Sequence, residues 1–213
     1  MRLAPLILAA ALLGAAAVHA QTADDDRGEA LFLQWLPGHK AEVAAFETFL
    51  VQQKVNGLVP TYQLLRSASM WKECQASPFQ VPPAEQWPMA RDVLLLVAEL
   101  RRTNVLGPFA VASAYRDPAL NKCAHGSKHS SHMRFAVDIV PLGPTDDQKL
   151  CTFWRAEGKA WNMGLSRYPS GRIHVDRTGW RTWGEDYTSR SSYCNQLAQK
   201  RPPISGFTRT ARN

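Results

Sequence analysis

The chain lacks any long apolar run after its first twenty residues, so no later segment is expected to span a bilayer. It contains no Cys-x-x-Cys pair, and because metal-binding thiols usually come in close pairs, its cysteines are not expected to bind zinc. It also lacks a basic-aromatic stripe and any nucleic-acid-binding motif, which argues against nucleic acid as a partner. No internal repeat and no long low-complexity tract interrupts it.

The first twenty residues have the pattern of a secretory signal peptide. Arg2 provides the positive start, the run from Leu6 to Val18 is apolar, and Val18-His19-Ala20 offers a cleavage site. The apolar run is shorter than the roughly 20 residues that a membrane-spanning helix needs, although an uncleaved N-terminal anchor is an alternative. We therefore expect an exported protein, periplasmic or secreted, whose mature chain begins near Gln21.

All four cysteines lie beyond this segment, at Cys74, Cys123, Cys151 and Cys194. An even number of cysteines in an exported chain predicts two disulfides. Three pairings are possible, and the spacing does not choose between them.

Basic residues exceed acidic ones, with 25 Lys and Arg against 18 Asp and Glu and a formal net charge of +7. This excess suits an anionic partner. Much of it is spread singly or lies in the tail after Lys200, so a solvated, mildly basic surface is the alternative.

Residue periodicity predicts alternating helices and short strands. Apolar residues at helical spacing, or a capping pattern at Thr145 and Gln148, indicate helices, and β-prone runs indicate strands. The expected helices cover 42–51, 88–104 and 145–161, and the expected strands cover 109–114, 135–140 and 172–175. This order predicts an α+β fold with a small, mainly antiparallel sheet and flanking helices. The expected parts are a signal peptide (1–20), an N-terminal helical part packed on the same domain (21–107), a core (108–200) and a basic flexible tail (201–213).

Histidines and aspartates cluster in two places. His125, His129 and His132 precede Asp138, and a second group lies in the strand-like run Ile173-His174-Val175-Asp176. Alternation along a strand would place both polar residues of that run on one face and its apolar residues on the other. A catalytic zinc is usually held by three protein ligands and one water, and the imidazoles and carboxylates of these two clusters could supply the three ligands. Hydrogen-bonded core histidines, or a merely solvated loop, are the alternative.

Three motifs in order resemble a known family. They are Ser113-Ala-Tyr-Arg116-Asp-Pro-Ala-Leu-Asn121, then Ser130-Ser-His132 leading to Ala136-Val-Asp138, and finally Ile173-His-Val-Asp176. Together, over Pro108 to Trp183, they look like the D-alanyl-D-alanine carboxypeptidase-like zinc metallopeptidases. That family cuts peptidoglycan peptides and shares its fold with the hedgehog signalling domain.

The resemblance implies roles for particular residues. His132, Asp138 and His174 match the zinc ligands of the family. Arg116 matches the arginine that grips the substrate carboxylate or carbonyl, and Ser130 matches a serine of the substrate pocket. The family often has an aromatic residue where Trp180 and Trp183 follow the last histidine, although core packing would explain these tryptophans equally well.

The spacing of the first two ligands departs from the family pattern. Only five residues, Met133 to Val137, separate His132 from Asp138, one fewer than usual, and none of them is glycine. We expect a shortened turn from which His132 still reaches the metal. His129 is the reserve ligand.

A second departure concerns the general base. Many family members carry an acidic residue three positions before the last histidine, where this chain has Gly171. Asp176 is the best substitute, because it shares the strand face of His174. It could equally be a partner that orients this ligand. Glu185 and Asp186 are more distant alternatives.

These observations predict zinc-dependent hydrolysis of peptidoglycan peptides, as a DD-carboxypeptidase or an endopeptidase. The two departures favour an alternative, a non-catalytic cell-wall-binding domain on the same fold with a degenerate active site. A structural periplasmic protein with incidental histidines is a third hypothesis.

Overall fold

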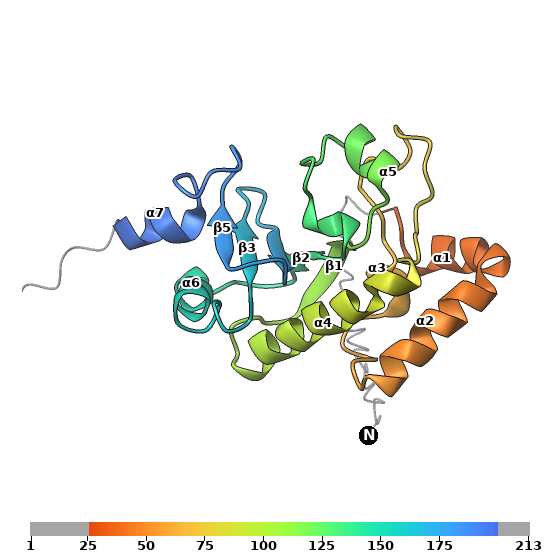
Figure 1. Cartoon of the computed structure of the whole chain (residues 1–213), viewed down its shortest axis with the longest axis horizontal. Coiled ribbons are helices and arrows are strands. Elements are labelled where there is room, and N and C mark those ends of the chain that lie inside the picture. Colours follow the sequence, from red (N-terminus) through yellow and green to blue (C-terminus); the bar gives the residue numbers. More distant parts are fainter. Residues whose placement is uncertain (1–25, 200–213) are drawn as a thin grey trace, which may run out of the picture.

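The computed structural model describes residues 26 to 199. Over this range the chain forms an α+β fold with seven α-helices and one five-stranded mixed sheet (Figure 1). The predicted α+β class, with a small and mainly antiparallel sheet, is therefore confirmed. The expected signal peptide and most of the expected basic tail lie outside the described residues. None of the helices between residues 26 and 199 is long and apolar enough to cross a membrane.

Four helices precede the sheet in the chain; α1, α2 and α3 lie to the right of the sheet in Figure 1, and α4 runs below it. They are α1 (Glu29–Trp35), α2 (Lys40–Gln52), α3 (Thr61–Leu64) and α4 (Trp87–Arg102). The predicted helices at 42–51 and 88–104 correspond to α2 and α4. On α2 the residues at helical spacing, Val43, Phe46 and Leu50, are the buried ones. The short α1 and α3 were not predicted.

The sheet has the strand order β1-β2-β4-β3-β5. Its strands are β1 (Phe109–Ser113), β2 (Val137–Pro141), β3 (Gly164–Arg167), β4 (Ile173–Asp176) and β5 (Arg181–Trp183). Three of its pairings are antiparallel, and β3 and β5 pair in parallel. The three predicted strands are present with shifted ends, whereas β3 and β5 are too short to show a periodic pattern.

Alternation along the strands divides the core from the polar face. Ile139, Ile173 and Val175 are fully buried and join the apolar face of α4 in one hydrophobic core. The residues between them, Asp138 and His174, therefore project from the opposite face of the sheet. This is the face on which the candidate site lies.

The prediction for the helix at 145–161 was wrong at both ends. The helix α6 is Asp147–Ala156, and its N-cap is Asp146, whose carboxylate accepts a hydrogen bond of 2.9 Å from Lys149 N. Thr145 instead donates to the Asp147 side chain. Beyond the helix end, a side chain at Gly158 would lie 2.3 Å from the Trp154 carbonyl, so only glycine fits there.

Two disulfides are present, as predicted, and their pairing is Cys74–Cys123 and Cys151–Cys194. The first joins the irregular 67–83 segment to the end of α5 (Pro118–Cys123). The second, with both cysteines buried, joins α6 to α7 (Tyr193–Gln199). Disulfides are typical of exported proteins.

Reduction is expected to destabilise the protein in two steps. Because Cys123 is exposed and Cys151 and Cys194 are buried, mild reductant should open the Cys74–Cys123 bond first. Loss of either bond should lower the free energy of unfolding by about 2–5 kcal/mol. Thermal melts of the Cys74→Ser/Cys123→Ser and Cys151→Ser/Cys194→Ser variants, each with and without reductant, measure both effects. A melting temperature that does not change with reductant in the wild type would contradict this expectation.

Candidate metal centre

Strand register brings together two of the three predicted ligands. Asp138 on β2 is the direct antiparallel partner of His174 on β4. Side chains of directly opposed residues on one face are about 4.5–5.5 Å apart at their Cβ atoms. Asp138 and His174 are therefore neighbours because of the sheet itself, and no loop conformation is needed to bring them together.

The third ligand comes from a short 3-10 turn, Ser131–Met133, which precedes β2. The Ser130 hydroxyl caps this turn by accepting a hydrogen bond of 3.3 Å from His132 N. The His132 carbonyl accepts from Arg116 N at 3.1 Å, and its ring nitrogen Nδ1 bonds to the Ala114 carbonyl. These contacts fix the turn against the end of β1.

The short turn between His132 and Asp138 requires an unusual backbone conformation at one residue. Phe135 has a φ of 135° and its side chain is fully buried. This region of backbone conformation favours glycine, and a non-glycine residue there is strained by about 1–3 kcal/mol. The buried side chain of Phe135 anchors the turn in this conformation, and His132 still reaches Asp138.

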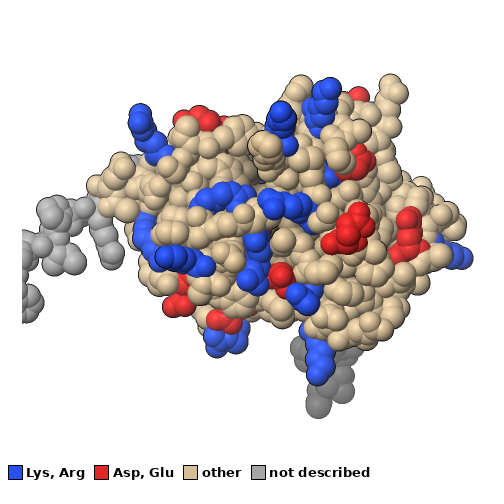
Figure 2. Space-filling view, in the orientation of Figure 1, with Lys and Arg blue, Asp and Glu red and all other residues tan. Residues whose placement is uncertain are grey.

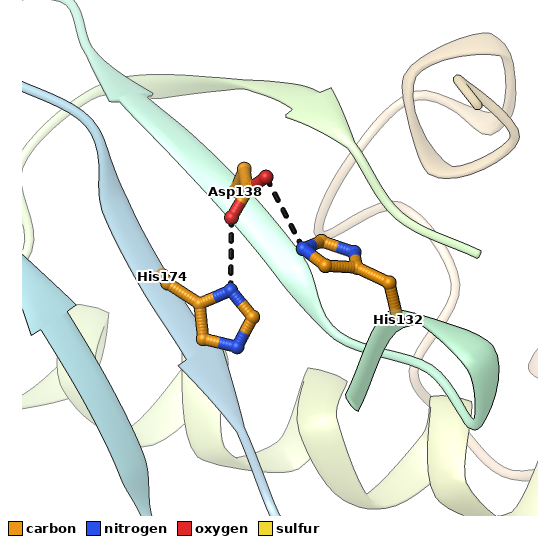
Figure 3. A group of neighbouring side chains, drawn as sticks. All are labelled: His132, Asp138 and His174. Atoms are coloured by element: carbon orange, nitrogen blue, oxygen red, sulfur yellow. Dashed lines mark hydrogen bonds and ion pairs between the residues drawn. The ribbon is translucent and has the colours of Figure 1, made fainter. Parts of the chain in front are cut away.

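The ligand atoms of His132, Asp138 and His174 all lie within 4.8 Å of one another and are buried (Figure 3). Asp138 Oδ1 is 2.9 Å from His174 Nδ1, and Asp138 Oδ2 is 3.2 Å from His132 Nε2. The other nitrogen of each ring has an acceptor, the Ala114 carbonyl for His132 and the Asp176 carboxylate for His174. When the outer nitrogens donate, the inner ones carry lone pairs that point at one place, so this group could hold a metal ion.

Asp176 lies behind His174 and is fully buried. Its Oδ2 accepts from His174 Nε2 at 2.9 Å and from Arg181 at 2.8 Å. Its Oδ1 accepts from the backbone and hydroxyl of Thr178, both at 2.7 Å. The carboxylate fits there because Gly164 faces it across the sheet, where a Cβ atom would lie 2.4 Å from Oδ2. Both oxygens are thus occupied by partners within the protein.

The pKa shifts of Asp138, His132 and His174 favour one distribution of protons among these three side chains. Burial alone would raise the pKa of Asp138, but His132 and His174 outweigh it and hold the pKa well below its usual range. Burial and the charge of Arg116 lower the pKa of His132. Burial would also lower the pKa of His174, yet hydrogen bonds to Asp138 and Asp176 raise it to about 9. In the metal-free chain at neutral pH, His174 therefore carries the proton that a metal would displace.

The cluster forms part of the wall of a cleft of about 700 Å³. Arg116, Arg172 and Arg181 also line it, together with Tyr168 and Glu185. Burial and the charge of Asp138 raise the pKa of Tyr168 to about 12, so its hydroxyl stays a donor at neutral pH. A metal at the cluster would therefore face a cleft whose charged lining residues are three arginines and two carboxylates.

The structure places Arg116 and Ser130 in this cleft, but both also hold the ligands. The Arg116 guanidinium donates to Asp138 Oδ2 at 2.9 Å and its Nε donates to Ser113 Oγ at 2.9 Å. Ser130 caps the turn of His132. His129 lines the cleft and is exposed, outside the group of three.

The other predicted candidates lie apart from the cluster. His125 is exposed in a loop. Trp180 stacks on Trp154, with 5.3 Å between centroids. Trp183 is the tryptophan at the site, because its ring lies 5.1 Å from that of His174.

Compared with known proteins, the chain matches no protein-family model, no curated protein and no solved structure.

The sequence did not indicate Tyr168, Arg172 or Arg181 as residues of the site. Tyr168 follows β3 and Arg181 begins β5, the two strands without a periodic pattern. Arg172 precedes His174 by two residues, and strand alternation alone could have placed it on the same face.

Proposed function

We propose that the protein is a zinc-dependent hydrolase that cuts peptide bonds of peptidoglycan, with the fold and ligand set of the D-alanyl-D-alanine carboxypeptidase-like metallopeptidases. The observation that carries this proposal is the buried group of His132, Asp138 and His174 at the wall of a cleft. Two imidazoles and one carboxylate are a usual donor set of catalytic zinc, which keeps one position for water. When bound, zinc would supply a water that is acidic enough to attack at neutral pH.

The charge of the cleft favours a substrate with carboxylates. Among the described residues that line it, three are arginines and two are carboxylates, Asp138 and Glu185. Lys and Arg side chains also gather near the centre of the face shown in Figure 2, with Asp and Glu side chains to their right. Stem peptides of peptidoglycan carry free carboxylates, and guanidinium groups bind carboxylates with paired hydrogen bonds. Both the resemblance and the charge thus support the same substrate class.

The side chains of the cleft have distinct roles in this proposal. The guanidinium of Arg116 fixes Asp138, and its remaining N–H groups are available to the substrate. The hydroxyl of Tyr168 donates to the oxygen on which negative charge develops. Asp176 holds the ring of His174 in one orientation and one tautomer.

Hydrolysis of purified peptidoglycan tests the proposal directly. The chain from Gln21 to Asn213, oxidised and loaded with zinc, should release new products that chromatography and mass spectrometry resolve. Free D-alanine would identify a carboxypeptidase, and conversion of cross-linked dimers into monomers would identify an endopeptidase. His132→Ala should abolish either activity. A zinc-loaded wild type that leaves both bond types intact would refute the proposal.

A non-catalytic cell-wall-binding domain is the second candidate. The observations that favour it are the buried position of Asp176 and the glycine at position 171, which leave the residues around His174 without a carboxylate free to take a proton. In that case the protein should sediment with insoluble peptidoglycan and leave it uncut.

A further inference from the structure

Peptide hydrolysis by a water needs a group that takes a proton from that water. Of the described residues that line the cleft, only Asp138 and Glu185 carry a carboxylate. Asp138 belongs to the metal-binding group, where His174, His132 and Arg116 surround it. Asp176 does not line the cleft, and both its oxygens already accept hydrogen bonds. Among the carboxylates of the described cleft, Glu185 is thus the one that remains to accept a proton.

Glu185 lies in a loop that is anchored on the metal site. Trp183, the last residue of β5, packs on His174, and its carbonyl accepts a hydrogen bond of 2.9 Å from Ser166 Oγ. Gly184 then passes so close to Ser191 that an added Cβ would lie 2.3 Å from the Ser191 carbonyl. These contacts fix the backbone on the N-terminal side of Glu185.

The loop closes on itself after Glu185. The Asp186 carboxylate accepts from Thr188 N at 2.9 Å, from Thr188 Oγ1 at 2.8 Å and from the Ser191 hydroxyl. Tyr187 N donates to the Gly184 carbonyl at 3.0 Å, and Gly184 N donates to the Thr188 carbonyl at 3.1 Å. Asp186 is therefore a structural residue of the loop, and Glu185 is the acidic residue of this loop that lines the cleft.

The Glu185 side chain is exposed, and among the described residues its carboxylate has no hydrogen-bond or ion-pair partner. We propose that Glu185, which nothing in the resemblance assigns, is the general base of the proposed hydrolysis. This inference rests on the proposed function. The carboxylate takes one proton from the attacking water as the water oxygen bonds to the peptide carbonyl carbon. It then gives that proton to the leaving nitrogen as the C–N bond breaks, so that acid and amine products balance the peptide and water consumed.

The zinc-loaded chain from Gln21 tests this role with purified peptidoglycan as the probe. Glu185→Gln should lower kcat by about 10²- to 10⁴-fold, the usual contribution of a general base. Its zinc content and melting temperature should equal those of the wild type, and its KM for the peptide substrate should stay close to the wild-type KM. The matched control is Glu157→Gln, an exposed glutamate outside the cleft, which should keep full activity.

Chemical rescue separates a proton acceptor from a loop residue. Glu185→Ala should be inactive, and added formate should restore part of its turnover, because a small carboxylate can occupy the space that the side chain leaves. An active wild type with an equally active Glu185→Gln variant would overturn this inference and leave the proposed function intact. A variant that loses zinc or stability together with activity would also overturn it. A wild type that cuts no peptide would overturn both.

Discussion

Asp176→Asn should weaken zinc binding by about 10- to 100-fold, which is the usual effect of removing a partner that orients a metal-bound histidine. The carboxylate lies 2.9 Å from His174 Nε2, and no other described carboxylate bonds to that atom. The asparagine keeps the shape of the side chain but loses the charge that holds the ring. Because Asp176 is buried behind the ligand, zinc in excess should restore most of the turnover. Competition against a chromophoric chelator measures the affinity.

The same variant decides between the two roles that the sequence left open for Asp176. A general base at this position would give the opposite result, unchanged zinc affinity and a loss of turnover that zinc does not restore. Asp147→Asn is the matched control, because Asp147 also pairs with an arginine, Arg167 at 2.9 Å, outside the metal-binding group. It should leave zinc affinity unchanged.

Zinc affinity should rise about tenfold per pH unit from pH 6.5 towards pH 9. His174, with a pKa raised to about 9, must lose its proton before Nδ1 can bind metal, whereas the lowered pKa of His132 keeps that ring neutral across this range. Affinity at pH 7 should thus be about a hundredfold below its plateau. Chelator competition at several pH values measures the slope. A flat profile, or a slope of two protons, would contradict the assignment.

The free energy of unfolding of the metal-free chain should fall as the pH rises, whereas the zinc affinity should increase. A histidine whose pKa is higher in the folded state than its unfolded value of 6.5 stabilises the fold in full below that pH. This stabilisation is lost as the pH rises through about 9. Urea unfolding of chelator-treated protein at pH 6.5 and pH 9 tests the sign, and Asp176→Asn should flatten the difference. Greater stability at pH 9 would contradict it.

The resemblance implied that His132, Asp138 and His174 form one group, and the structure brings these three residues together. Asp138 and His174 lie in strands with clear apolar alternation, so the face that they share was predictable. The fold class and the longer helices followed for the same reason, since periodic burial leaves a periodic pattern. The N-cap of α6 lies one residue after the predicted one. Thr145 and Asp146 are both of residue types that favour the N-cap, and in the structure Asp146 occupies it.

The role of Asp176 could not be read from the sequence, because it depends on strands that have no pattern of their own. Arg181, which holds the carboxylate, comes from β5, and Gly164, which makes room for it, comes from β3. The parallel pairing of these strands brings both residues to Asp176. Glu185 was only a distant alternative in the sequence, because its position depends on the hydrogen bonds of its loop.

The zinc content of the chain from Gln21 to Asn213, beside that of His132→Ala and His174→Ala, tests the metal centre most directly. The protein is stripped with a chelator, exposed to one equivalent of zinc at pH 7.5, desalted and measured by mass spectrometry. If His132, Asp138 and His174 hold the metal, the wild type should contain about one zinc per chain and both variants should contain none. The zinc content of His129→Ala should equal that of the wild type. A wild type that retains no zinc, or variants that retain as much as the wild type, would contradict it.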